Sequence, residues 1–214
     1  MSNRRRIQIA GVPQHVLNRG NDRCDIFRAD KDYAFFLFAL REAALRYQLE
    51  VHSYALMTNH FHLVVTPRHA TAVSMAMQVA ESRYVRYFNR RYSRTGGLFE
   101  GPFKSLFIDS EPYWFACMRY VELNPVRAGL VSDPAVYRWS SYRANGLGVE
   151  DQIIVPHLLY VALGNSAESR QGSWRGLCCE ALSSDDLFEI RDAIRRGTFG
   201  TVPVESKIIF EPSK

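Results

Sequence analysis

The chain has 214 residues, of which 47% are hydrophobic and 23% charged, the composition of a globular protein long enough to bury a core. No apolar run approaches the ~20 residues that a bilayer-spanning helix requires, and residues 7–12 are too short for the apolar core of a secretory signal, so we expect no membrane partner. The four cysteines are scattered and form no Cys-x-x-Cys pair. This pattern argues against a disulfide framework and a zinc knuckle and favours a reducing cytoplasm.

Positive charge is concentrated in the first part of the chain. Residues 1–130 hold 18 Lys and Arg against 11 Asp and Glu, a balance of +7, whereas residues 131–214 hold 9 against 11, a balance of −2. Aromatic residues lie between many of these arginines. Such a surface favours a polyanionic partner, most often nucleic acid, and the alternative is an ordinary solvated basic surface.

The spacing of apolar residues predicts an α+β fold. In chain order it predicts a strand over 11–20 that ends in a Gly-Asn turn, a helix over 31–48 capped by Asp30, strands over 49–57 and 60–66 joined by a Thr58-Asn59 turn, a helix over 71–92, a strand over 103–109, and a helix from Glu111, capped by Ser110, to about Asn124. This order is typical of a ferredoxin-like antiparallel sheet with helices on one face. We expect residues 1–145 to form this domain. Residues 146–214 are expected to form a mostly helical C-terminal extension, with a helix over 183–196 and a short strand over 207–210.

Three arginines of the predicted 71–92 helix share one face. Arg83, Arg86 and Arg90 are spaced at i, i+3 and i+7, with aromatic residues nearby. Placed along a groove, this face would bind phosphates and offer rings on which bases stack. The same spacing fits a solvated helix face whose aromatic residues turn to the core, so both interpretations stay open.

Two histidines share one face of a predicted strand. Side chains alternate along a strand, so His60 and His62 point one way while Phe61 and Leu63 point the other. Two imidazoles held side by side form part of a site for a divalent metal. The same pattern also fits polar residues on the solvated face of an ordinary strand.

The third metal ligand is expected from the last helix of this domain. Tyr120 and Asn124 are four residues apart, and therefore lie one helical turn apart on the same face. An amide oxygen with two imidazoles suits Mg²⁺ or Mn²⁺, whereas a structural zinc ion prefers four N or S ligands. The Tyr120 hydroxyl beside a metal-bound phosphate is a candidate nucleophile. The plain alternatives are a core aromatic residue for Tyr120 and a helix C-terminal residue for Asn124.

Five segments of the chain together resemble one protein family. Residues 57–64 (MTNHFHLV) resemble the His-hydrophobic-His motif of the single-tyrosine HUH transposases, and residues 120–129 (YVELNPVRAG) are similar to the nucleophile segment of the REP-associated tyrosine transposases. Segments 11–21, 101–105 and 139–142 match that branch in the same order. One segment departs from it, because the family usually has Trp-x-Gly-Arg where this chain has Phe99-Glu100-Gly101-Pro102.

The resemblance implies a DNA-nicking and rejoining enzyme, a metal-dependent endonuclease and strand transferase that acts on hairpin-forming, REP-type single-stranded DNA. It implies that Tyr120 is the nucleophile, which forms a covalent 5′-phosphotyrosine and leaves a free 3′-hydroxyl. It also implies that His60, His62 and Asn124 bind the Mg or Mn ion. Together with the charge pattern, it suggests a DNA-binding set that comprises Arg4, Arg5, Arg6, Arg19, Arg83, Arg86, Arg90 and Lys104.

Such an enzyme is expected in the cytoplasm, associated with the nucleoid, as a monomer or a homodimer. Two other functions stay open on the sequence. One is a non-catalytic protein that binds hairpin DNA through a degenerate active site, and the altered Glu100–Pro102 segment motivates it. The other is a phosphodiesterase that uses a metal-activated water and in which Tyr120 is structural.

Overall fold

The structure is a computed structural model and describes residues 8–197. Its strands are β1 (Gln14–Arg19), β2 (Leu49–Met57), β3 (His60–Pro67) and β4 (Lys104–Phe107). Its helices are α1 (Asp30–Tyr47), α2 (Ala72–Arg91), α3 (Glu111–Glu122), α4 (Asn124–Arg127), α5 (Tyr142–Leu147), α6 (Leu158–Val161), α7 (Ala167–Cys179) and α8 (Ser184–Arg196), with 3₁₀ turns η1 (Asn21–Arg23) and η2 (Pro134–Val136). Within residues 8–197 no helix combines the length and the apolar character that crossing a membrane requires.

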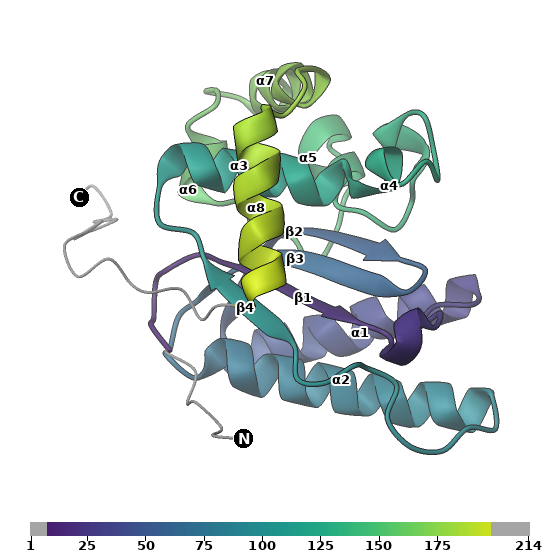
Figure 1. Cartoon of the computed structure of the whole chain (residues 1–214). Coiled ribbons are helices and arrows are strands. Elements are labelled where there is room, and N and C mark those ends of the chain that lie inside the picture. Colours follow the sequence, from purple (N-terminus) through teal and green to yellow (C-terminus); the bar gives the residue numbers. More distant parts are fainter. Residues whose placement is uncertain (1–7, 198–214) are drawn as a thin grey trace.

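The four strands form one antiparallel sheet in the order β2-β3-β1-β4 (Figure 1). β2 and β3 are joined by the predicted two-residue turn at Thr58-Asn59. Paired residues of neighbouring strands project from the same face of a sheet. The pairing of β1 with β3 sets Leu17 opposite His62 and Arg19 opposite His60, so these four side chains share a face. The expected antiparallel α+β fold is confirmed.

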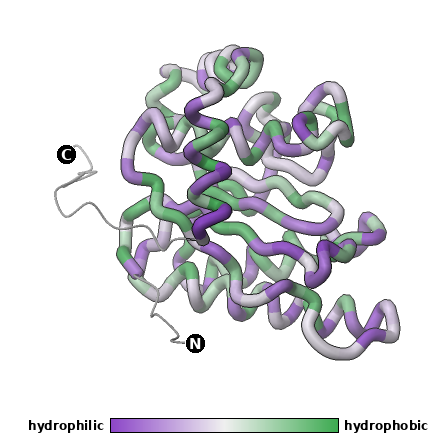
Figure 2. Tube along the Cα trace, in the orientation of Figure 1, coloured by the Kyte–Doolittle hydropathy of each residue, from purple (hydrophilic) through white to green (hydrophobic). Residues whose placement is uncertain are grey.

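Helices cover both faces of this sheet, whereas the sequence predicted them on one face. α1 and α2 pack on the first face, over a core that includes Phe61 and Leu63 of β3. α3 and α8 cover the second face, where Val64 of β3 packs with Trp114 and Ile190. Nearly all residues of β2 and β3 are buried, those on either face alike, as in strands that are enclosed between two layers. Along α8, hydrophilic and hydrophobic residues alternate, as expected for a helix with one buried side (Figure 2).

Several predicted boundaries shift. The first strand begins at Gln14 instead of Gly11, and the residue that precedes α1 as its N-cap is Ala29 instead of Asp30. The helix predicted from Glu111 to about Asn124 ends at Glu122 as α3, and α4 begins at Asn124. The two are separate because Pro125 has no backbone N–H to continue the helical hydrogen bonds. The predicted helix over 183–196 is observed as α8, and its N-cap is Ser183. The strand predicted over 207–210 lies outside the described residues.

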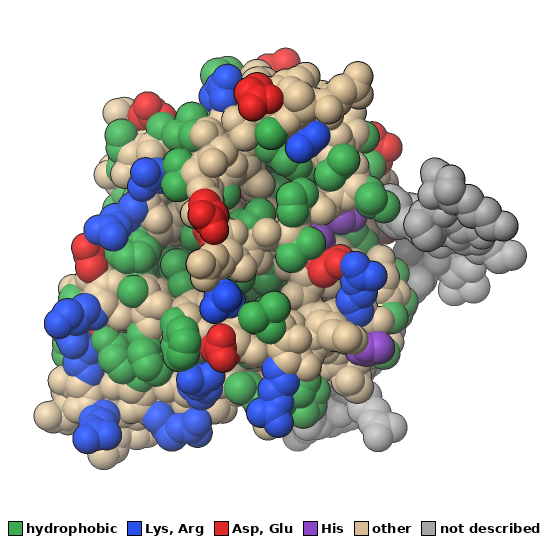
Figure 3. All heavy atoms as spheres, turned by 180° about the vertical axis from the view of Figure 1, so that it is seen from behind, with side chains coloured by type: hydrophobic (Ala, Val, Ile, Leu, Met, Phe, Trp, Pro, Cys, Tyr) green, Lys and Arg blue, Asp and Glu red, His purple; other side chains and the backbone are tan. Residues whose placement is uncertain are grey.

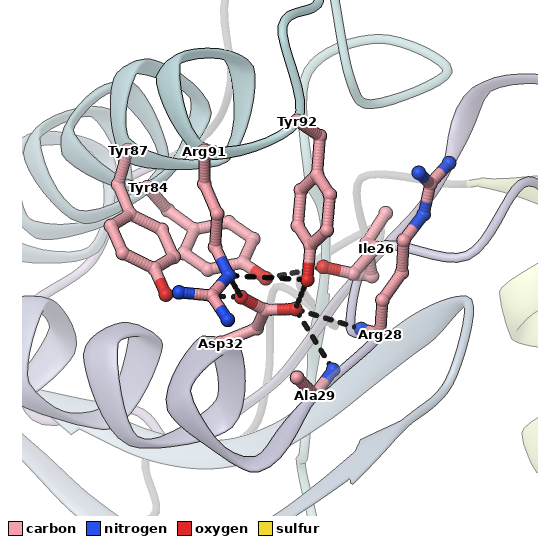
Figure 4. Close-up of polar contacts among 8 residues, drawn as sticks. All are labelled: Ile26, Arg28, Ala29, Asp32, Tyr84, Tyr87, Arg91 and Tyr92. Atoms are coloured by element: carbon pink, nitrogen blue, oxygen red, sulfur yellow. Dashed lines mark hydrogen bonds and ion pairs between the residues drawn. The ribbon is translucent and has the colours of Figure 1, made fainter.

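A buried carboxylate joins the start of α1 to the end of α2 (Figure 4). Asp32 Oδ2 accepts hydrogen bonds from the backbone N–H groups of Arg28 and Ala29, which fix the first turn of α1. The remaining partners lie at the end of α2: the Tyr92 hydroxyl donates to Oδ2 (2.7 Å), the Tyr87 hydroxyl donates to Oδ1 (3.0 Å), and Arg91 Nε lies 3.3 Å from Oδ1. The carboxylate therefore sets the relative position of the two helices.

A second buried carboxylate connects α3 to the C-terminal segments. Glu122, the last residue of α3, accepts hydrogen bonds from Ser141 Oγ, from Asn145 Nδ2 (2.7 Å) and from the indole N–H of Trp174 (2.8 Å). Burial raises the pKa of Glu122 from 4.5 to about 7, and these three donors oppose the rise. Its hydrogen bonds reach α5 and α7, so the end of α3 is fixed from the C-terminal side of the chain.

The raised pKa of Glu122 predicts a pH-dependent contribution to stability. The folded chain, in which Glu122 has a pKa of about 7, holds the carboxyl proton more tightly than the unfolded chain, in which the pKa is 4.5. This proton therefore stabilises the fold fully below pH 4.5, and the stabilisation is lost as the pH rises through 7. Buried histidines with lowered pKa values make stability change with pH in the opposite direction. The wild type is therefore compared with Glu122→Gln, which contains the same histidines. We expect the stability of this variant relative to the wild type to rise by about 2 kcal/mol between about pH 5 and pH 8. Urea unfolding at both pH values measures this, and a difference that stays constant would contradict it.

Candidate active site

His60 and His62 lie on the sheet face that α3 covers, with their ring centroids 5.0 Å apart. His60 Nδ1 is 2.7 Å from the side-chain oxygen of Asn59. Because an amide oxygen only accepts hydrogen bonds, this contact places the His60 proton on Nδ1 and leaves the lone pair on Nε2. His60 is thus prepared to bind a metal through Nε2.

A third histidine orients His62. Nε2 of His15, on β1, lies 2.9 Å from His62 Nδ1. If His62 donates through Nδ1, its own Nε2 carries a lone pair, which is the arrangement of a metal-binding histidine supported by a neighbouring acceptor. Burial lowers the pKa of His15 and of His60 to about 4 and that of His62 well below 6.5, so all three rings are neutral at pH 7. Neutral rings are the form that binds metal ions.

Tyr120 is placed directly against these histidines by α3. The Ser110 hydroxyl caps the helix by accepting from the Tyr113 N–H (3.4 Å), and Pro112 occupies its first turn, where proline is tolerated. The ring of Tyr120 meets the ring of His62 edge-on at 5.8 Å and that of His15 at 6.0 Å between centroids. The structure therefore brings the predicted nucleophile to the predicted metal ligands.

Asn124 begins α4, one turn beyond Tyr120, and its side chain is 9% exposed. Its amide nitrogen is buried and has no hydrogen-bond partner among the described residues. A buried N–H donor without an acceptor costs stability, but a metal ion would not offset that cost, because it binds the amide through Oδ1. In residues 8–197 no group of three His, Cys, Asp or Glu side chains is arranged to hold a metal. His60, His62 and Asn124 Oδ1 stay the predicted donor set, and imidazole nitrogens with an amide oxygen suit Mg²⁺ or Mn²⁺.

Arg127, which the sequence did not single out, covers the face of the Tyr120 ring. Its guanidinium carbon lies 4.2 Å from the ring centroid, and Nη2 donates to the backbone carbonyl of Tyr120. Burial lowers the pKa of Arg127 to about 10, so the group stays charged at pH 7. A cation at this distance attracts the ring electrostatically and restricts its rotation.

Two of the predicted DNA-binding residues share the sheet face of the histidines. Arg19 is paired with His60 across the strands, and its charge contributes to lowering the pKa of that histidine. Lys104, on β4, is paired with Leu17 and therefore projects from the same face. Its ammonium group donates to the carbonyl of Ile194 at the end of α8 (2.9 Å), so it also holds this helix in place.

The other predicted DNA-binding residues are not gathered at this site. Arg83, Arg86 and Arg90 lie on α2, which packs on the opposite face of the sheet. Seen from behind, Lys and Arg side chains gather in the part of the surface over α1 and α2 (Figure 3). Arg83 also lies 5.3 Å from the ring centroid of Phe38, as expected of an arginine that stacks on an exposed aromatic ring. Arg4, Arg5 and Arg6 lie outside the described residues.

The sequence contained signals for His15 and Arg127, the two residues of this site that it did not single out. His15 lies four positions before Arg19 in one strand, an even spacing, so the two side chains share a face. Arg127 follows Tyr120 by seven residues, which is two helical turns. Only the pairing of β1 with β3 reveals that this face of β1 adjoins His62, because sequence periodicity does not specify which strands are neighbours.

The family model "Transposase IS200 like" matches residues 9–124, which is more than half of the chain and includes His15, His60, His62, Tyr120 and Asn124. The chain belongs to this family. Its fold is that of a solved REP-associated tyrosine transposase bound to a REP hairpin, with a TM-score of 0.56, 16% sequence identity, and coverage of 74% of this chain and 93% of that chain. A second solved structure, of a transposase-like protein from Deinococcus radiodurans, has a TM-score of 0.39, 18% identity, and coverage of 56% of this chain and 96% of that chain. No curated protein sequence matches the chain.

Proposed function

We propose that this IS200-like transposase is a DNA-nicking and rejoining enzyme of the REP-associated type, which cleaves hairpin-forming single-stranded DNA through a covalent 5′-phosphotyrosine. The observation that carries the proposal is the contact of the Tyr120 ring with His62, together with the free Nε2 position that Asn59 leaves on His60. A metal ligand pair and a phenol on facing elements are what a tyrosine-dependent phosphoryl transfer requires. The solved relative bound to a REP hairpin supports DNA of this kind as the substrate.

In the proposed reaction, the Tyr120 oxygen attacks a backbone phosphorus atom. A bond forms between that oxygen and phosphorus, and the bond from phosphorus to the 3′ oxygen of the preceding nucleotide breaks. The phenolic proton leaves to solvent, and the 3′ oxygen takes up a proton. His60, His62 and Asn124 would hold Mg²⁺ or Mn²⁺, which when bound makes the phosphate more electrophilic and balances its added negative charge.

The residues of the chain position Tyr120 and His62 and limit the contact of Tyr120 with water. His15 holds His62 in one orientation, and α3 places the Tyr120 ring, which is 9% exposed, in a site enclosed by its neighbours. A nucleophile held in this way avoids the entropic cost of bringing two free molecules together. Because the phosphodiester energy is kept in the tyrosine–phosphate bond, attack by a 3′-hydroxyl would rejoin the strand.

The experiment is to incubate the protein with a single strand that contains a hairpin and a labelled 3′ segment, with and without Mn²⁺. We expect a labelled protein band on a denaturing gel that requires the metal and disappears with a chelator. A duplex of the same sequence is the matched control and should give no band. Tight hairpin binding with no band under any divalent ion would overturn the proposal in favour of a non-catalytic hairpin-binding protein. Cleavage without a covalent band would favour hydrolysis by a metal-activated water.

A further inference from the structure

A donor group of Arg127, beside Tyr120, has no acceptor among residues 8–197. Arg127 uses Nη2 to donate to the Tyr120 carbonyl, while its Nη1 is buried and has no hydrogen-bond partner among the described residues. A buried guanidinium N–H that lacks an acceptor costs free energy. The guanidinium carbon of Arg127 lies 4.2 Å from the centroid of the Tyr120 ring, so an acceptor for Nη1 would also lie close to the tyrosine.

α8 carries a second positive charge, Arg191, that acts electrostatically on Arg127. Arg191 follows Ile190, which is fully buried in the core shared with Tyr120, and its charge opposes the ionised form of Arg127. Among residues 8–197 neither arginine has an ion pair, whereas the neighbouring Asp192 pairs with Arg195 and Arg196. Positive charges that are not balanced by a carboxylate favour the binding of an anion nearby.

We infer that Arg127 donates from Nη1 to a non-bridging oxygen of the phosphate that Tyr120 attacks, while its contact with the ring holds the tyrosine in line. This inference rests on the proposed function and assigns a catalytic residue to it. As the bond between the Tyr120 oxygen and phosphorus forms and the bond to the 3′ oxygen breaks, negative charge grows on the non-bridging oxygens, and the guanidinium balances it. The planar fork of arginine suits both contacts at once, which an ammonium group does not.

The test compares rates of covalent adduct formation in single-turnover reactions of the full-length chain with Mn²⁺ and the hairpin strand. We expect Arg127→Gln to slow the reaction about 100-fold, the usual effect of removing one donor to a transition-state oxygen. The control is Arg138→Gln, because Arg138 also stacks on an aromatic ring, at 4.5 Å from the centroid of Trp139, but lies elsewhere and pairs with Asp30. It should react at the wild-type rate.

A methylphosphonate at the scissile position separates contact with phosphate from a structural role. Replacing one non-bridging oxygen by a methyl group removes the acceptor, so in one of the two stereoisomers the wild type and Arg127→Gln should react at the same rate. A 100-fold gap that persists with both isomers would show that Arg127 only supports the fold, and would overturn the inference. If Arg127→Gln unfolds at a lower temperature than the wild type, the rates on the phosphate and methylphosphonate substrates are compared for Arg127→Lys, which keeps the positive charge.

The outcomes distinguish the two proposals. If the wild type forms no adduct, the proposed function fails. If the wild type forms it and Arg127→Gln forms it equally fast, only the role of Arg127 is wrong.

Discussion

Tyr120→Phe should slow formation of the covalent protein–DNA adduct by at least about 1,000-fold, because the substitution removes the only atom that bonds to phosphorus. The loss of one oxygen leaves the rest of the ring in place, so its edge contacts with His15 and His62 and the stacking of Arg127 are retained. Hairpin binding should therefore persist. Denaturing gels measure the adduct, and fluorescence anisotropy of a labelled hairpin measures binding on the same protein.

Tyr113→Phe is the matched control for this experiment. Tyr113 lies on the same helix, two turns before Tyr120, and its hydroxyl interacts with Cys117. It should form the adduct at the wild-type rate. If Tyr120→Phe forms the adduct as fast as Tyr113→Phe, another group is the nucleophile and the assignment of Tyr120 is wrong.

Asp32→Ala should lower the free energy of unfolding by about 3 to 5 kcal/mol, the range for removing one partner of a buried charged cluster. The substitution leaves the N–H groups of Arg28 and Ala29 without their acceptor at the start of α1. It also leaves the hydroxyls of Tyr87 and Tyr92 without theirs. Urea denaturation followed by circular dichroism measures the change.

Asp30→Ala provides the comparison from the same turn of the same helix. Asp30 pairs with Arg138 at 3.0 Å, but its side chain is 69% exposed, and exposed ion pairs contribute about 1 kcal/mol or less. We expect this variant to unfold near the wild-type midpoint. If the two variants lose equal stability, the buried cluster is not the main connection between α1 and α2.

The sequence was sufficient for much of the local structure and for naming His60, His62 and Tyr120, whose rings the structure brings together. The shared face of His60 and His62 follows from the two-residue period of strands, which β3 obeys, although the β2–β3 pairing has a register shift between Val51 and Ser53. The one-turn spacing of Tyr120 and Asn124 likewise follows from helical geometry, although Pro125 divides the helix between them.

Long-range neighbours were not predictable in this way. Periodicity placed the arginines of α2 on one helix face, but it did not show that α2 covers the sheet face away from His62, since β3 is buried by a core cluster on each face. The roles of His15 and Arg127 depend on which strands pair and on where the chain turns after Asn124. These features come from tertiary packing, which no local pattern records.

The hydrogen bonds of Glu122 have a practical consequence for protein engineering. This carboxylate lies between Tyr120 and Asn124 in the chain, and its partners include Trp174, far beyond the segment that the family model matches. An expression fragment trimmed to the matched segment would remove Ser141, Asn145 and Trp174 together. The helix that carries the proposed nucleophile would then end on a carboxylate that has lost its hydrogen-bond donors, so a shortened version of this transposase should be designed to retain α5 and α7.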